Sequence, residues 1–355
     1  FQFNKELNIK YISMKFENVI YPGFNKTFEE LGCFNLNKNN ELEVFDYFNI
    51  DWVQSAVTEM IKEIDSSVPL KFIEPTTDDM ASASKLVNAD LSIEDVKKNF
   101  NVGKRIIGIS SGKGGVGKST ISSLIGMGFA KQGKKVGILD ADIWGYSIPK
   151  MLGAKFPPIP FNNRIFPSKI NGLNVISMEY FVKQDEAVIW RGPMLHKAIE
   201  QFLYEVLWQD IDILLIDMPP GTGDVSISLS QFLNFYETII VTTPQSNATA
   251  VAERAGIMSQ KVNSSIIGVI ENMSYLENGK EKLFPFGQGG GEELSKRLNV
   301  DFIGSLPLYN NVSEYSESGN LAEFASDENF SVIENMVNAI NNIAPKKKPI
   351  NLKIN

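Results

Sequence analysis

The sequence predicts a doubly wound α/β domain that is preceded by a small α+β domain. From about Lys104 onward, short runs of Val, Ile and Leu alternate with amphipathic segments of helical length. Strands that are buried on both faces have such continuous apolar runs, and their alternation with helices indicates a mostly parallel sheet with right-handed crossovers. The expected strands are 105–110, 134–142, 172–177, 210–219, 237–244, 265–272 and 301–308.

The first hundred residues lack this alternation and are rich in Asn and Phe. A strand is expected at 41–48, followed by an amphipathic helix at 51–64 with Asp51 as its N-cap. The predicted organisation is a small α+β domain at 1–74, a polar linker with one or two short helices at 75–103, the doubly wound domain at 104–345 and a basic tail at 346–355.

Composition narrows the functional classes. The chain has 34 Lys and Arg against 42 Asp and Glu, a formal charge of −8, so we expect no nucleic-acid partner, because such binding rests on neutralising phosphates. No apolar run approaches the roughly 20 residues that span a bilayer, so no membrane partner is expected. The single cysteine, Cys33, excludes an intrachain disulfide and fits a reducing, cytoplasmic compartment. We expect it to be a small core residue.

A glycine-rich loop, "ISSGKGGVGKST" at 109–120, follows the first expected strand of the α/β domain and precedes a helix. It contains the pattern G-x-x-x-x-G-K-[ST], in which backbone N–H groups and the helix N-terminus bind phosphate. Lys118 is expected to reach the β- and γ-phosphates, and Ser119 to ligate Mg²⁺. The alternative is a glycine-rich turn that binds nothing, and the order of strand, loop and helix argues against it. The expected nucleotide-binding residues of the loop are Gly112, Lys113, Gly114, Gly115, Val116, Gly117, Lys118, Ser119 and Thr120.

The second lysine of the loop, Lys113, is a solvated charge if it is considered alone. However, "GKGGVGKST" resembles the deviant Walker A motif of dimeric ATPases, which include the MinD and ParA partition proteins, the nitrogenase iron protein and the Mrp/ApbC iron–sulfur carriers. In that group the extra lysine reaches the partner's nucleotide. The resemblance implies a homodimer with ATP between the protomers and Lys113 acting across the interface, as an arginine finger does.

Three aspartates lie at the ends of expected strands, at the edge where α/β domains bind ligands: Asp140 and Asp142 in "ILDADIWGYS", and Asp217 at the end of "ILLID". An acid at a strand end is often only a turn residue. By the resemblance, Asp142 orients the attacking water, Asp217 is the Walker B carboxylate and Asp140 lies near the magnesium. "PPGTGD" at 219–224 resembles switch II, whose glycines let the loop move with the γ-phosphate. The expected catalytic residues are Lys113, Lys118 and Asp142, and the expected magnesium ligands, partly through water, are Ser119, Asp140 and Asp217.

Longer segments resemble the Mrp/ApbC family in particular, over nearly the whole of 104–320. They are "LDADIWGYSIPKMLG", "WRGPMLHKAIEQFL", "LLIDMPPGTGDVSISLSQ", "VTTPQSNATAVAERA" and "VIENMSYL". The family implies slow ATP hydrolysis, a role in iron–sulfur cluster assembly, and apoproteins or assembly factors as partners. It also implies that Asn272 contacts the adenine and that Pro307 flanks it. The only histidine, His196, has no Cys or His neighbour, which favours a structural role over a metal ligand or a catalytic base.

The segment after "ENMSY" departs from the family. Most Mrp/ApbC carriers have a Cys-x-x-Cys pair there, and the two thiolates of each protomer hold a four-iron cluster. Here "LENGKEKLFPFG" offers carboxylates, amines and aromatic rings, which do not replace soft thiolates. Asn278-Gly279 instead predicts a hairpin with arms at 275–277 and 280–284. We expect no iron–sulfur ligands in this segment, and the sequence leaves cluster binding open.

Two other functional classes share the predicted fold. A MinD/ParA-like partition or positioning ATPase needs a membrane-binding amphipathic helix or a basic DNA-binding surface, and the tail provides neither. A ligase that phosphorylates a small carboxylate does not account for the "RGPM" and "ENMSY" segments. The sequence favours an ATP-hydrolysing Mrp/ApbC-type protein, with the MinD/ParA-like module as the alternative.

Overall fold

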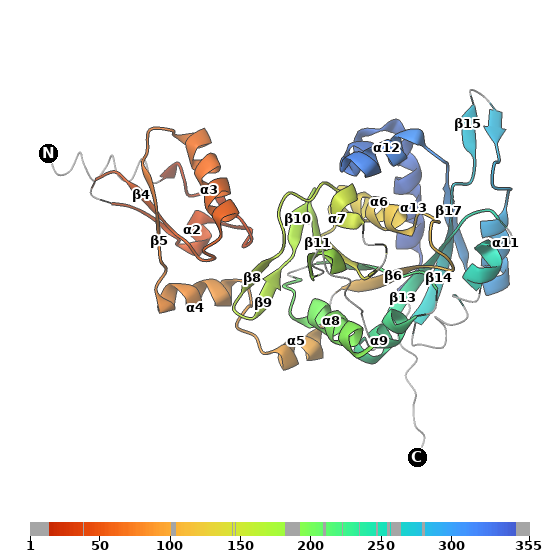
Figure 1. Ribbon diagram of the computed structural model, residues 1–355, viewed down its shortest axis with the longest axis horizontal. Coiled ribbons are helices and arrows are strands. Elements are labelled where there is room, and N and C mark those ends of the chain that lie inside the picture. The colour runs from red at the N-terminus through yellow and green to blue at the C-terminus, as the bar shows by residue number, and fades with distance from the viewer. Residues whose placement is uncertain are drawn as a thin grey trace, which may run out of the picture. The chain divides into compact units, whose positions relative to one another are not determined.

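The computed structural model (Figure 1) describes residues 14–37, 39–100, 104–143, 145, 147–181, 192–208, 211–221, 223–233, 235–245, 248–253, 256, 264–278 and 281–345. It divides into two compact units. The first comprises the chain up to Val96, together with Pro158–Pro167 and Glu205–Gln209. The second comprises Lys97–Pro157, Ser168–Tyr204 and the chain from Asp210 onward. The predicted basic tail, 346–355, lies outside the described residues.

The first unit contains a three-stranded sheet in which β4 pairs antiparallel with β3 and parallel with β5. Helix α3 connects the parallel pair and spans Asp51–Ile64, as the sequence predicts, because its apolar residues at helical spacing face the core. The predicted cap is wrong: the N-cap is Ile50, and Asp51 is the first helical residue, where its charge favours the helix dipole. The elements of this unit are β1 (Ile20–Tyr21), β2 (Lys26–Thr27), α2 (Phe28–Leu31), β3 (Phe34–Leu36), β4 (Leu42–Phe45), α3, β5 (Leu70–Ile73), α4 (Thr77–Leu86), most of α5 (Ile93–Asn99), β8 (Ile159–Phe161) and β9 (Arg164–Phe166).

Aromatic side chains build the core of the first unit. Phe24 lies 5.1 Å from Phe161 and 5.2 Å from Phe166 between ring centroids, so the hairpin β8–β9 belongs to this core although it comes late in the chain. Cys33 is fully buried in the same core, which confirms the expectation from sequence. Burial raises the pKa of its thiol to about 12.

The second unit contains an eight-stranded sheet in the order β10-β11-β7-β12-β6-β13-β14-β17. Only the pair β10–β11 is antiparallel, and the other pairs are parallel, which confirms the predicted fold class. All seven expected strands are present, and the edge strand β10 is additional. The bounds are β6 (Arg105–Ser111), β7 (Val136–Asp140), β10 (Ser168–Ile170), β11 (Leu173–Ser177), β12 (Ile213–Asp217), β13 (Tyr236–Thr242), β14 (Ser264–Asn272) and β17 (Asp301–Leu306).

Helices cover both faces of this sheet (Figure 1). α6 and α13 pack on one face against apolar side chains such as Ile107 and Ile239, whereas α11 and the helical residues 248–253 pack on the other against Ile240 and Val269. This alternation along β13 is that of a strand buried on both faces. The bounds are α6 (Lys118–Lys131), α7 (Ile148–Met151), η1 (Met178–Phe181), α8 (Gly192–Tyr204), α9 (Asp224–Phe232), α11 (Gly290–Leu298), α12 (Asn310–Ser318), η2 (Leu321–Ser326), η3 (Glu328–Phe330) and α13 (Ser331–Asn342).

A hairpin is present after β14, as predicted, with β15 (Leu276–Asn278) paired antiparallel with β16 (Glu281–Leu283). The predicted position of its turn is wrong by one residue, because Asn278 pairs with Glu281 and so belongs to the first arm. The turn residues Gly279 and Lys280 lie outside the described part of the chain. The glycine run that follows has a packing role. A Cβ on Gly290 would lie 2.3 Å from the backbone oxygen of Pro244, and the Gly291 N–H donates to Glu271 at 2.6 Å. These glycines therefore let α11 begin directly against the ends of β13 and β14.

Candidate nucleotide site

The glycine-rich loop lies between the end of β6 and the start of α6, at the carboxyl edge of the sheet. Gly115 and Gly117 both have φ = 77°, a left-handed conformation that glycine adopts without strain, and Gly117 is the N-cap of α6. A cleft of about 360 Å³ opens on this loop. The cleft is lined by Ser111, Lys113, Gly114, Gly115, Gly117, Lys118, Ser119, Thr120, Asp142, Gly145, Ser147 and Pro220.

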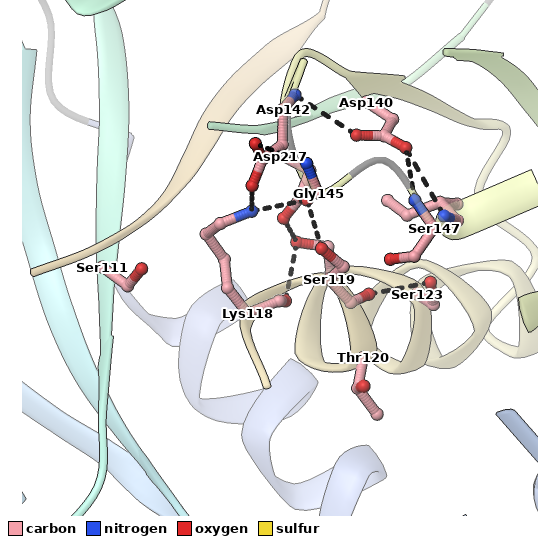
Figure 2. Close-up of polar contacts among 12 residues, drawn as sticks. Ser111, Lys118, Ser119, Thr120, Ser123, Asp140, Asp142, Gly145, Ser147 and Asp217 are labelled. Atoms are coloured by element: carbon pink, nitrogen blue, oxygen red, sulfur yellow. Dashed lines mark hydrogen bonds and ion pairs between the residues drawn. The ribbon is translucent and has the colours of Figure 1, made fainter. Parts of the chain in front are cut away.

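Asp217 joins the two residues that the motif assigns to phosphate and magnesium. Its Oδ2 accepts hydrogen bonds from Lys118 Nζ and from Ser119 Oγ, both at 2.6 Å (Figure 2). Its Oδ1 accepts one from Ser122 Oγ, also at 2.6 Å. Asp217 is fully buried and Lys118 is 6% exposed, so this ion pair is protected from solvent. Asp217, Lys118 and the half-buried Ser119 thus form one hydrogen-bonded cluster.

Asp142 approaches the same lysine from the other side. Its Oδ2 lies 3.7 Å from Lys118 Nζ, and its Oδ1 accepts a hydrogen bond of 3.1 Å from the N–H of Gly145 (Figure 2). The side chain lines the cleft, so it faces the space where the resemblance puts the attacking water. Lys118 therefore lies between two carboxylates from the ends of β7 and β12.

Asp140 lies behind the cleft. It is fully buried and accepts hydrogen bonds from the backbone N–H groups of Asp142 and Ser147, each at 3.3 Å, and from Ser177 Oγ at 3.0 Å. Burial and the neighbouring Asp217 carboxylate raise the pKa of Asp140 to about 7. These contacts give Asp140 a role in shaping the loop after β7, while its predicted place near magnesium stays a prediction.

The family follows from comparison with known proteins. The sequence model of a protein family, ParA, described as "NUBPL iron-transfer P-loop NTPase", matches residues 102–344 of this chain. The chain belongs to this family. The resemblance to the iron–sulfur carriers, which rested on the segments quoted above, is thereby confirmed.

Curated relatives of this NTPase are named iron-sulfur cluster carrier proteins. The Bacillus subtilis (strain 168) protein is 45% identical over 204 residues, which cover 57% of this chain and 58% of the relative. The Escherichia coli (strain K12) protein is 43% identical over 220 residues, which cover 61% of this chain and 60% of the relative. The matched region thus spans less than two thirds of either relative.

Solved structures agree on the fold. A nucleotide-binding protein from Archaeoglobus fulgidus, in complex with ADP, is 34% identical, and the match covers 68% of this chain and 96% of that protein, with a TM-score of 0.57. The cell division ATPase MinD of Pyrococcus furiosus has a TM-score of 0.52 at 21% identity, and the match covers 68% of this chain and 99% of MinD, which is a likeness of fold alone.

Asn272 has a contact in this NTPase that the sequence did not predict. The residue is 5% exposed at the end of β14, and its Nδ2 donates a hydrogen bond of 2.8 Å to the backbone oxygen of Val116. A Cβ on Gly117 would lie 2.2 Å from the same nitrogen, so only glycine leaves room for this contact. Asn272 therefore braces the phosphate loop. Pro307 is buried just after β17, and the predicted adenine contacts of both residues stay predictions.

Of the remaining predicted features, Lys113 and the start of switch II lie at the cleft, whereas His196 does not line it. Lys113 lines it, and its Nζ donates to Gln245 Oε1 at 3.2 Å. Gly221 of the predicted switch II donates its N–H to the backbone oxygen of Ser111 at 2.8 Å, whereas residue 222 lies outside the described chain. His196 contacts α9, with a hydrogen bond of 3.0 Å between its Nδ1 and Ser228 Oγ, a contact that agrees with a structural role.

Proposed function

We propose that this protein binds and hydrolyses ATP with Mg²⁺ as a homodimer, and that it serves iron–sulfur cluster assembly. The observation that carries the nucleotide chemistry is the hydrogen-bonded cluster of Lys118, Ser119 and Asp217, with Asp142 at 3.7 Å from the lysine nitrogen. The ADP complex of the Archaeoglobus protein, which is 34% identical, supports a nucleotide as the ligand.

The donor atoms fit magnesium. The Ser119 hydroxyl and the Asp217 carboxylate are hard oxygen ligands that lie 2.6 Å apart, and Mg²⁺ in such sites takes few protein ligands besides phosphate oxygens and water. Among the described residues no group of three or more His, Cys, Asp or Glu could hold a metal ion alone, which fits an ion that arrives with the nucleotide. Bound there, the ion would neutralise charge on the phosphates.

The chain's own residues would do the rest. The loop N–H groups and the α6 N-terminus would bind the phosphates, with Lys118 as the cation on the β- and γ-phosphates. Asp142 would orient the attacking water, because its carboxylate faces the cleft and is held by the Gly145 N–H. Lys113 would act on the nucleotide of the partner protomer and stabilise charge in the transition state.

The iron–sulfur role rests on the family and on the names of the curated relatives. The chain itself does not fit a cluster site after β14, because the segment between Asn272 and Gly290 contains no cysteine. Cys33 is buried in the first unit with its pKa raised to about 12, so it is not available as a thiolate. We therefore propose that cluster ligands come from a partner, either an iron–sulfur apoprotein or an assembly factor, in a reducing cytoplasm.

A phosphate-release assay of the full chain with ATP and Mg²⁺ tests the nucleotide part of the proposal. We expect slow turnover that is abolished in Lys118→Ala and falls at least about a hundredfold in Asp142→Ala, because both residues act at the reacting phosphate. Lys134→Ala, an exposed lysine beyond the end of α6, is the control and should leave the rate unchanged. Turnover in Lys118→Ala equal to that of the unmodified protein would exclude this site as the ATPase centre.

A further inference from the structure

Gln245 lies in the connection between the end of β13 and the helical residues 248–253, and hydrogen bonds and packing hold its backbone in place. Its backbone oxygen accepts the N–H groups of Ala248 at 2.9 Å and Thr249 at 3.1 Å, so it lies at the start of the helical residues 248–253. The preceding residue, Pro244, packs its backbone oxygen against Gly290 of α11. The backbone from which the Gln245 side chain extends is therefore held on two sides.

The phosphate loop lies directly on the same helix. A Cβ on Gly112 would be 2.3 Å from the backbone nitrogen of Ala252 and 2.4 Å from the carbonyl carbon of Val251, so the two backbones are in contact. Across this contact, Lys113 Nζ donates its hydrogen bond of 3.2 Å to Gln245 Oε1, and Ser111 Oγ donates to the Lys113 backbone oxygen at 3.0 Å. Hydrogen bonds thereby hold both the ammonium group and the backbone of Lys113. Lys113 lines the cleft and Gln245 does not.

The two lysines of the loop have acceptors of different charge. Lys118 lies between the carboxylates of Asp217 and Asp142, which compensate its charge. Lys113 forms no ion pair with any described residue, and its acceptor is a neutral amide. An amide oxygen orients an ammonium group without neutralising it, whereas a carboxylate would bind it more strongly and cancel its charge.

We propose that Gln245 is a positioning residue for Lys113: it holds the ammonium beside the phosphate loop with its charge uncompensated, ready for an anionic phosphoryl group. This inference rests on the proposed ATPase function. It predicts that the amide is required both for its reach and for its neutrality, so Gln245→Ala and Gln245→Glu impair turnover for opposite reasons.

The test measures Lys113 directly as well as turnover. The full chain and its variants are labelled with limiting acetic anhydride, and peptide mass spectrometry compares acetylation of Lys113 with that of Lys118 in each sample. We expect Lys113 labelling to rise at least about threefold in Gln245→Ala and to fall at least about threefold in Gln245→Glu, because an ion pair keeps the amine protonated. ATP turnover should fall about tenfold in both variants while KM for ATP changes less than twofold. Gln132→Glu, on the exposed surface at the end of α6, is the control and should change neither quantity.

Unchanged Lys113 labelling in both variants would overturn the inference whether or not the protein hydrolyses ATP. Altered Lys113 labelling with unaltered ATP turnover would also overturn the inference, because the Lys113–Gln245 contact would then have no effect on ATP hydrolysis. If the unmodified protein releases no phosphate from ATP, the proposed function fails and the positioning role falls with it, and the labelling separately shows whether the Lys113–Gln245 contact exists.

Discussion

Replacing Asn272 with Ala separates two roles that this residue can have. The resemblance gives it a contact with adenine, whereas the structure gives it a hydrogen bond of 2.8 Å to the backbone oxygen of Val116 in the phosphate loop. A contact with adenine affects only the affinity for ligands that contain the base. A hydrogen bond that braces the loop affects the stability of the free protein and the affinity for any ligand with phosphates.

The expected magnitude follows from burial. Asn272 is 5% exposed, so its removal leaves the Val116 oxygen without its donor in a site that water reaches poorly. Leaving a buried acceptor unsatisfied costs about 1–3 kcal/mol, and we expect the free energy of unfolding to fall by about 2 kcal/mol. Because 1.4 kcal/mol corresponds to a factor of ten in an equilibrium constant, a loop that loses part of this energy should bind phosphate groups about tenfold more weakly.

Urea denaturation and calorimetric titration with ATP and with inorganic triphosphate measure these effects. We expect Asn272→Ala to weaken both ligands by a similar factor, since the loop binds the phosphates of each. Asn338→Ala is the matched control: its amide is on the exposed face of α13, where it accepts a hydrogen bond from Gln132, so its loss should cost less than about 0.5 kcal/mol. If Asn272→Ala unfolds at the same urea concentration and loses affinity for ATP but not for triphosphate, the bracing role is wrong.

Three further predictions concern stability and cluster chemistry. Arg105→Met should lower the free energy of unfolding by about 3 kcal/mol in urea, because the guanidinium faces the buried Glu237 carboxylate and also donates to the backbone oxygens of Ile340 and Ile343 at the end of α13. Adding Glu237→Leu should restore part of that loss. Cys33 in the folded protein at pH 8 should react with an aromatic disulfide at least about a thousandfold more slowly than in urea, because a pKa of about 12 leaves almost no thiolate; equal rates would refute its burial. Anaerobic reconstitution of the purified chain with iron and sulfide should give no stable brown protein, and several irons per dimer would show that the chain itself supplies cluster ligands.

The sequence predicted those parts of the fold that have a local signal. The strands β6, β12 and β14 are continuous apolar runs because they are buried on both faces, and α3 has an amphipathic period, so both could be located from the sequence alone. The hairpin β8–β9 had no such signal. Its residues come after the first strands of the α/β domain in the chain. Only the packing of Phe161 and Phe166 against Phe24 assigns the hairpin to the first unit.

The candidate site likewise contains residues that the sequence predicted and contacts that it did not. Lys118, Ser119 and Asp217 belong to motifs with fixed positions relative to strands, and the structure brings them together. Gln245 and Asn272 lie in the family segments "VTTPQSNATAVAERA" and "VIENMSYL", but neither segment reveals the contact of its residue with the loop. Their side chains meet the loop only when β13 pairs with β6 and β14 pairs with β13, so the signal is in the strand order rather than in local spacing.

Strand order also explains why so flexible a loop keeps one shape. Glycine loses more conformational freedom on folding than other residues, and the six residues from Gly112 to Gly117 include four glycines. Side chains at the ends of three other strands of the sheet hold the loop and the first residues of α6: Asp217 at the end of β12, Gln245 after β13 and Asn272 at the end of β14. In these three contacts the paired residues are 98, 132 and 156 positions apart in the sequence. Long-range contacts within the sheet therefore offset the conformational entropy that the glycine-rich loop loses on folding. A phosphate site built in this way is ordered before its ligand arrives, and less binding energy is lost to ordering the loop when a nucleotide binds.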